Sequence, residues 1–276
     1  KLYTNGVLLE YSAGYQIATQ DVLDLTLSII PAKLVGNLGR VIQRSREVSA
    51  ELQINEFDGV LVLGDWDYSR PIALGGDKRK TTSSGVHADC FLTRSGRSTL
   101  LVDGQPSGLP PLLGHARDDV GQVQLYSGET QIIGSGGTTS YGLGEERRRF
   151  ERSYQNHSTL RQVGRPLIHG VDAFVCEELY WPDISWQEVG HLRASLGITY
   201  QDFHHKREVS LAGSGAAMMC VDTISACERE VPIEITWILP SSRESRDLVV
   251  KLDELRFTAL AAGKNITFRL ASSVPF

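Results

Sequence analysis

The stretch from Asp21 to Asp65 constrains the fold of this chain most, because its hydrophobic residues change their period several times. Strict alternation of apolar and polar residues indicates a half-buried strand, and apolar residues three and four apart indicate one face of a helix. The predicted elements are a strand at 23–29, a helix at 34–42, a strand at 48–54 and a strand at 60–63. This order predicts the opening of a β-rich domain.

The rest of the chain favours short strands separated by glycine-rich turns, as in a sandwich or barrel. Strands are predicted at 86–93, 98–102, 207–211, 216–224, 231–239, 248–252, 257–260 and 266–270, and two more within 120–133 around Ser127 and Gly128. A helix is predicted after Pro182, with Ser185 as its cap and Glu188 completing a capping box. Residues 145–152 are predicted to form a short helix or to continue the preceding loop. We therefore expect an all-β fold, an eight-stranded jelly-roll β-sandwich with one or two short helices.

Domain organisation follows from the same pattern. Residues 1–20 carry little charge and are predicted to form an N-terminal arm, and residues 21–276 a single jelly-roll domain. A long variable loop region is expected around 134–219, and the glycine-rich stretch 134–144 within it is interpreted as a flexible surface loop. The polar stretch 67–84, with the basic run 78–80, is interpreted as another surface loop.

Composition excludes some classes of function. The chain has 276 residues, a net charge of -5 and a sequence pI near 5.8, which argues against broad non-specific binding of nucleic acid. Its four cysteines show no zinc-finger spacing, so free thiols are expected. No segment has the apolar length of a membrane span, and none resembles a signal peptide. The chain does not begin with methionine, which fits either a piece cut from a longer precursor or a trimmed chain.

Several residues are candidates for catalysis or metal binding, but each has a simpler interpretation. His204 and His205 lie near Asp202, but adjacent strand residues point to opposite faces, so the two imidazoles should not converge on a metal. His87 and Asp89 share one face of a strand while Cys90 lies on the other, which leaves no triad. We therefore expect no metal site at either place.

The remaining candidates are carboxylates, aromatic residues and a glycine-rich loop. Glu177 and Glu178 could supply half of a glycosidase carboxylate pair, but no second positioned acid accompanies them. Tyr180, Trp181 and Trp186 could stack on a sugar, although core or interface packing is the simpler role. The loop 134–140 lacks the lysine and following helix of a phosphate-binding loop. The sequence thus predicts no catalytic residue, no cofactor and no metal ligand.

The two ends of the chain resemble capsid proteins of picorna-like positive-strand RNA viruses. The strand-helix-strand-strand order carries this resemblance, together with a tight turn in which Phe57 and Gly59 match the family. The segment 248–276 also resembles the last strand of that family, with its small-residue and proline tail. Asp118-Asp119-Val120 lacks the phenylalanine of the Asp-Asp-Phe cleavage motif, so no autocleavage is assigned.

The resemblance implies a structural capsid protein, released from a polyprotein, and not an enzyme. Its implied partners are other capsid subunits in an icosahedral shell, with genomic RNA enclosed and a host receptor possible. Its implied location is the virion, and the host cell cytoplasm during assembly. Two alternatives stay open: a β-sandwich module that binds carbohydrate or protein through Tyr180, Trp181 and Trp186, and a β-rich hydrolase or effector that uses Glu177, Glu178, Asp202 or His204.

Overall fold

The structure is a computed structural model of the 276-residue chain. It describes residues 13–51, 53–54, 59–60, 85–87, 89–105, 113–128, 130–170, 172, 174–179, 182–215, 217–226, 233–240 and 266–273. The predicted loop at 67–84, the predicted strands at 248–252 and 257–260, and residues 1–12 of the predicted arm lie outside these residues.

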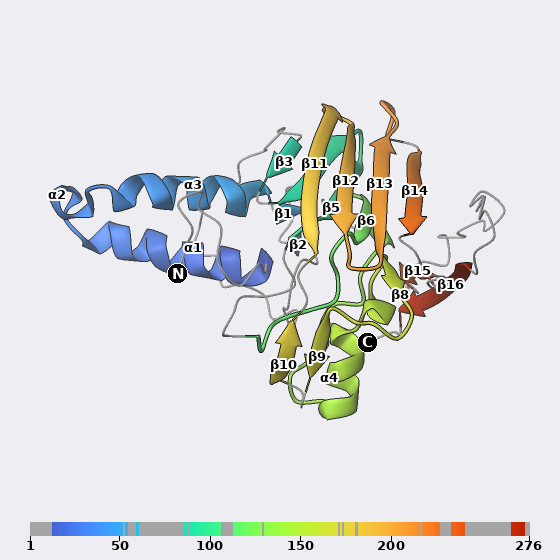
Figure 1. The fold of residues 1–276 in the computed structure, drawn as a ribbon. Coiled ribbons are helices and arrows are strands. Elements are labelled where there is room, and N and C mark those ends of the chain that lie inside the picture. Colours follow the sequence, from blue (N-terminus) through green and yellow to red (C-terminus); the bar gives the residue numbers. More distant parts are fainter. Residues whose placement is uncertain are drawn as a thin grey trace.

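The described part of the chain begins with a helical hairpin that projects from the β-rich body (Figure 1). Its helices are α1 (Ala13–Ile29), α2 (Ala32–Val35) and α3 (Leu38–Glu51). The strand predicted at 23–29 is therefore wrong. Leucine has a high helix propensity, whereas strands favour β-branched residues, and α1 is fixed by packing against α3: Gln16 Nε2 donates to Ser45 Oγ at 2.9 Å.

The helix predicted at 34–42 is confirmed in two parts, broken at Gly36, which has a φ of 49°. The strand predicted at 48–54 is wrong over most of its length, because α3 continues to Glu51. Only β1 (Gln53–Ile54) remains, paired with β2 (Gly59–Val60). Ile42, Ser45 and Ser49 are the buried residues of α3, and their helical spacing outweighs the local alternation.

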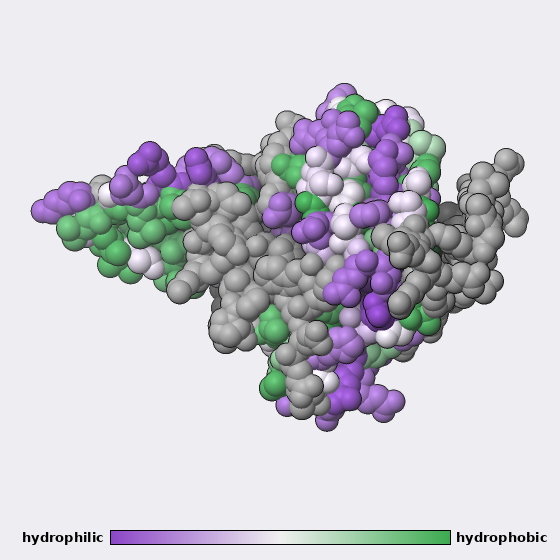
Figure 2. All heavy atoms as spheres, viewed as in Figure 1, coloured by the Kyte–Doolittle hydropathy of each residue, from purple (hydrophilic) through white to green (hydrophobic). Residues whose placement is uncertain are grey.

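One face of the hairpin is apolar and exposed, and it forms a green surface along the projecting arm in Figure 2. Its exposed residues include Val22, Leu25, Ile29, Leu34 and Leu38, each more than half exposed. No helix in the described part of the chain combines the length and apolar character that crossing a membrane requires.

The first large sheet is an antiparallel meander in the order β3-β4-β5-β6-β7. Its strands are β3 (Gly85–His87), β4 (Cys90–Ser95), β5 (Ser98–Asp103), β6 (Val123–Ser127) and β7 (Thr130–Ile133). These confirm the strand predicted at 98–102 and the two strands predicted within 120–133, whereas the single strand predicted at 86–93 is divided by a turn at Asp89 into β3 and β4. Gly96 and Gly128 take positive φ values of 57° and 60° in the hairpin turns, a conformation that favours glycine.

The second large sheet is another antiparallel meander, in the order β11-β12-β13-β14. Its strands are β11 (Asp183–Gly190), β12 (Arg193–Thr199), β13 (Phe203–Leu211) and β14 (Met218–Ala226). The strands predicted at 207–211 and 216–224 are thus confirmed, but the helix predicted after Pro182 is wrong. Ile184 and Trp186 pack against the core while Ser185 and Gln187 are exposed, so this segment has the period of a strand.

A smaller sheet and a helix complete the body. The sheet has the order β16-β15-β8, in which β15 (Ile233–Pro240) pairs in parallel with β16 (Ile266–Ser273) and antiparallel with β8 (Leu160–Gln162). This confirms the strands predicted at 231–239 and 266–270. The other elements are β9 (Ile168–Gly170), β10 (Cys176–Leu179), α4 (Glu145–Arg152) and a short 3-10 helix η1 (Tyr154–Asn156). Residues 145–152 therefore adopt the helical alternative.

The two meanders contribute to one hydrophobic core and so form a β-sandwich. Phe91 and Leu100 from the first sheet belong to the same buried cluster as Leu196 and Val209 from the second. The mainly β class is confirmed, whereas the described sheets do not confirm the eight-stranded jelly-roll order. The division into an arm at 1–20 and a domain at 21–276 stays a prediction.

The glycine-rich stretch 134–144 differs from the predicted flexible surface loop. Residues 134–138 are buried, and their hydrogen bonds are made inside the protein. Ser135 Oγ lies 2.8 Å from His157 Nδ1, and Asn156 Nδ2 donates to the carbonyl of Gly137 at 3.1 Å. A side chain at Gly136 would collide with Asn156, so this glycine allows the close approach.

Candidate functional site

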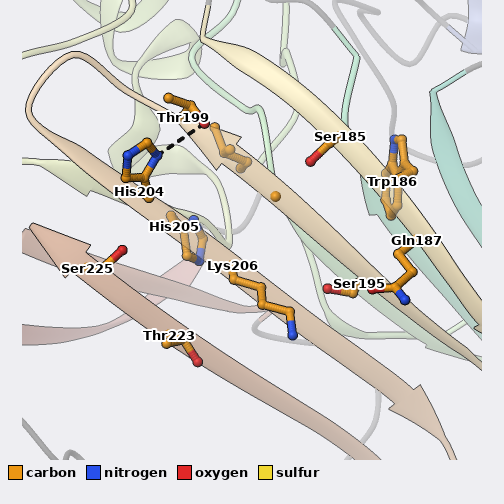
Figure 3. Close-up of a pocket in the computed structure, with 12 residues that line it drawn as sticks. Ser185, Trp186, Gln187, Ser195, Thr199, His204, His205, Lys206, Thr223 and Ser225 are labelled. Atoms are coloured by element: carbon orange, nitrogen blue, oxygen red, sulfur yellow. Dashed lines mark hydrogen bonds between the residues drawn. The ribbon is translucent and has the colours of Figure 1, made fainter.

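The residues predicted as metal candidates do not converge. The Nδ1 atom of exposed His204 lies 3.2 Å from Thr199 Oγ1 (Figure 3). His205 is buried instead, and its Nε2 lies 2.7 Å from Asp222 Oδ1. Burial lowers the pKa of His205 from its ordinary value despite this carboxylate. Asp202 forms an ion pair with Arg165 instead of joining the histidines. The prediction that the two imidazoles point to opposite faces is confirmed.

The other predicted candidates are also separate. Asp89 lies in the turn between β3 and β4 with a φ of 61°, and the Cys90 thiol donates to Asp103 Oδ1 at 3.3 Å. Cys90, Cys176 and Cys220 are free, as predicted. The structure does not describe several other candidates. These are the side chains of His87, Glu177 and Glu178, and all of Tyr180, Trp181, Cys227 and the run 78–80.

Trp186 is not an exposed stacking platform. Its side chain packs against the core and so closely over Gly104 that a Cβ atom there would lie 2.8 Å from the indole. For Trp186, the structure supports the core-packing role that the sequence analysis preferred.

Two arginines of α4 point into the protein and organise the loop before β6. Arg148 and Arg152 lie four residues apart on one helix face and are buried. Arg152 Nε donates to the carbonyl of Ala116 at 2.8 Å, and its Nη2 donates to the carbonyl of Leu113 at 2.9 Å. Arg148 Nη2 donates to the carbonyl of Gly114 at 3.3 Å. The backbone on both sides of His115 is therefore fixed by two buried cations.

An aromatic cluster forms where this loop meets α1, the glycine-rich stretch and the β9–β10 loop. Its members are Tyr15, His115, Tyr141 and Phe174, all partly exposed, with the buried Arg148 against them. The hydroxyl oxygens of Tyr15 and Tyr141 lie 3.0 Å apart. The His115 ring packs edge-on against both tyrosines, with centroid distances of 5.4 and 6.0 Å. The Arg148 guanidinium lies 5.1 Å from the Tyr141 ring centroid and 5.5 Å from that of Phe174.

The glycine-rich stretch places Tyr141 in this cluster. Glu151, fully buried on α4, accepts hydrogen bonds from the Thr139 backbone and hydroxyl, and it also pairs with Arg147 Nε at 2.9 Å. Arg148 Nη1 donates to Thr138 Oγ1 at 3.2 Å. Buried charges that are hydrogen-bonded on several sides hold a backbone firmly, so Tyr141 follows a rigid segment.

The cluster combines groups that can donate and accept protons at a partly exposed position. Tyrosine hydroxyls are donors and acceptors, and imidazole exchanges protons near neutral pH. Sequence reasoning missed this site, because its members come from four separate segments. The sequence signal that could have found the site is the group of arginines in the predicted short helix at 145–152. Arg148 and Arg152 are spaced four apart there, which places them on one face of the helix.

A model of the Heparinase II/III-like, C-terminal family matches residues 77–274, which is most of the chain. The chain belongs to this family. The match covers both meanders and α4, whereas the hairpin with Tyr15 precedes it. A search of curated protein sequences finds no significant match.

Solved structures with the same fold include two polysaccharide lyases. Heparinase III, the BT4657 gene product, superposes with a TM-score of 0.60 at 18% sequence identity, over 82% of this chain and 39% of that one. Heparan sulfate lyase HepC from Pedobacter heparinus has a TM-score of 0.56 at 17% identity, over 80% of this chain and 39% of that one. The Heparinase II/III-like chain thus spans about two fifths of the length of these relatives.

The family match overturns the viral interpretation. A heparinase-like chain is not a capsid subunit, so the predicted shell, its RNA, its host receptor and its location in a virion or host cytoplasm are wrong. The prediction of a non-enzymatic protein is also contradicted, because the matching family is named after heparinases and the HepC structure is that of a heparan sulfate lyase. The carbohydrate-binding alternative agrees better with these findings. The resemblance failed because its opening strand, at 23–29, is part of a helix.

The described residues offer no ready metal centre. Among them, no three histidine, cysteine, aspartate or glutamate side chains gather as they would around an ion.

Proposed function

We propose that this chain is the β-sandwich part of a protein that cleaves an acidic polysaccharide by elimination, and that the aromatic cluster holds the reacting groups. The contact that carries the proposal is the 3.0 Å approach of the Tyr15 and Tyr141 hydroxyls beside His115. Membership of the Heparinase II/III-like family and the shared fold of two named lyases support it. It departs from the prediction that no residue of the chain is catalytic.

Elimination from a uronate needs a base and an acid close together. The base removes the proton from the carbon next to the carboxylate, and the released electron pair forms a carbon-carbon double bond. The bond from the neighbouring carbon to the glycosidic oxygen then breaks, and the acid protonates that oxygen. His115 is assigned as the base, and Tyr141 as the acid, reprotonated through Tyr15.

The buried arginines are positioning residues in this scheme. Arg148 and Arg152 fix the carbonyls around His115, and Arg148 also packs against the Tyr141 ring. Their positive charge is additionally expected to favour approach of an anionic sugar to this end of the molecule. The jelly-roll order of strands is not needed for this proposal.

The first test is to incubate the chain with heparan sulfate, polygalacturonate and a neutral glucan, and to follow ultraviolet absorbance of the unsaturated product. We expect the double bond to form from an acidic polymer and not from the neutral one. His115→Asn should lower the rate about 100-fold or more, as loss of a general base does. His169→Asn, in the exposed part of β9, is the matched control and should keep the rate.

Two results would oppose the proposal. A cleaved product without a double bond would indicate hydrolysis and remove the elimination step. Saccharide binding with no turnover by the folded chain would instead favour the module that binds carbohydrate without cleaving it.

A further inference from the structure

The outer face of the second meander carries a hollow of about 390 Å³ (Figure 3). Strand register places its lining residues in rows across the sheet. The central row is Ser185, Gly197, Lys206 and Thr223, and a neighbouring row is Thr199, His204 and Ser225. This volume lies at the lower end of the range of small-molecule sites.

A glycine creates the depth of the hollow. Gly197 lies on β12 between Ser185 on β11 and Lys206 on β13, where any side chain would fill the centre of the face. A Cβ atom at this position would come within 2.6 Å of Ser185 Oγ. The floor is therefore backbone, which a ligand can approach closely.

The chemistry of the lining is that of a saccharide site. Five hydroxyl side chains surround the floor, and each can donate and accept hydrogen bonds. They belong to Ser185, Ser195, Thr199, Thr223 and Ser225, and the side-chain amide of Gln187 lies beside them. Among the described lining residues none is a carboxylate, whereas Lys206 is a half-exposed cation. Its nearest anion, Glu208 at 3.4 Å, is shared with Arg193 at 3.3 Å, so the two cations outweigh the single carboxylate.

We propose that this hollow is a second saccharide-binding site, separate from the aromatic cluster, which holds an anionic sugar with its acidic group on Lys206. The inference extends the proposed function to a non-catalytic contact and rests on it for the class of ligand. The site would hold one stretch of a polymer on the sheet, away from the reacting groups. A carboxylate and a sulfate share the chemistry that Lys206 recognises.

The test measures calorimetric binding of size-matched oligosaccharides to the whole chain. The probes are polygalacturonate, which carries carboxylates alone, heparan sulfate, which also carries sulfates, and a neutral maltooligosaccharide. Lys206→Ala should weaken binding of an anionic probe about 10-fold or more, because a charge-assisted hydrogen bond is lost. Arg193→Ala is the control: it removes an equally exposed cation that shares Glu208 but lies outside the hollow. It should change binding less than about twofold.

The outcomes separate this inference from the proposed function. Loss confined to heparan sulfate would identify the sulfate as the recognised group, and loss with both anionic probes would identify the carboxylate; either supports the site. Equal loss in both variants would indicate general attraction by surface charge and overturn it, as would unchanged binding in Lys206→Ala. Binding that depends on Lys206 without any elimination product would keep this site and refute the catalytic proposal.

Discussion

Replacing Arg207 with alanine is expected to lower the free energy of unfolding by about 3–5 kcal/mol, because it leaves a buried carboxylate without its cation. Arg207 on β13 lies opposite Asp222 on β14. Its Nε lies 2.7 Å from Asp222 Oδ1, and its Nη2 donates to Oδ2 at 2.9 Å. Such a two-pronged pair holds both side chains in one geometry.

Arg207 also links the two layers of the sandwich. Its Nη1 donates to the carbonyl of Gly121, before β6, and to that of Ser158, before β8, at 3.3 Å. The guanidinium lies 5.6 Å from the ring of Trp237 on β15. Truncation therefore removes contacts to β14, to β15 and to the segments before β6 and β8, which places the expected loss at the upper part of the range.

Urea denaturation of the wild type, Arg207→Ala and Arg193→Ala measures this effect. Arg193 pairs with Glu208 at the surface, and its loss should cost about 0–1 kcal/mol. Equal destabilisation by the two variants would show that the buried pair contributes no more than an exposed one.

The pH dependence of stability should report the same pair. Burial alone would raise the pKa of Asp222, but Arg207 and the His205 contact outweigh burial and hold that pKa well below its ordinary value. A carboxylate with a depressed folded pKa contributes stability above its unfolded pKa, about 3.9, and this is lost as the pH falls through the folded pKa. The wild type should therefore lose stability below about pH 4 more steeply than Arg207→Ala.

Replacing Tyr141 with phenylalanine is expected to reduce the rate of polysaccharide elimination by about 100- to 10,000-fold, the usual contribution of a general acid. The substitution keeps the ring that packs against Arg148 and His115 and removes the hydroxyl that approaches Tyr15. The loss should fall on kcat, since a proton donor acts in the transition state and hardly in binding.

Tyr126→Phe is the matched control for this experiment. Tyr126 lies in β6, and its hydroxyl donates to Gln124 Oε1 at 2.6 Å inside the protein. Removing it should cost about 1 kcal/mol of stability and leave kcat unchanged. A Tyr141→Phe protein with wild-type kcat would exclude the hydroxyl from the reaction, and a rise in KM alone would assign it to binding.

The meanders could be predicted from the sequence because their signals are local. The apolar run at 100–102 and the glycines at 96 and 128 indicate a strand and two turns without reference to the rest of the chain. The helical hairpin could not be predicted in this way. Its alternating leucines over 23–29 suit either a strand or a helix that is apolar around most of its surface. Packing of Gln16 against Ser45 favours the helix.

The site was harder to predict than the fold. Tyr15, His115, Tyr141 and Phe174 are far apart in sequence, and only the buried faces of α4 and of the glycine-rich stretch bring them together. Glycines that look like a flexible loop in the sequence are instead required for close packing against Asn156. The glycine-rich stretch beside the charged helix α4 is therefore a rigid buried segment. Composition alone does not distinguish such a segment from an exposed loop.

The sheet topology also implies an order of assembly. Each meander joins strands that are neighbours in sequence, with its longest connection at 104–122 between β5 and β6, whereas β8 at 160–162 must find β15 at 233–240 across the whole second meander. Loop-closure entropy makes the distant pairing the slower step. The amide of Thr236, which donates to the carbonyl of Thr159 beside β8 at 2.9 Å, should then gain protection from pulse-labelled hydrogen exchange after that of Val209, and simultaneous protection would contradict this order. A chain caught between the two stages would hold two formed sheets in which Arg207 is paired with Asp222 but still lacks its contacts with Ser158 and Trp237.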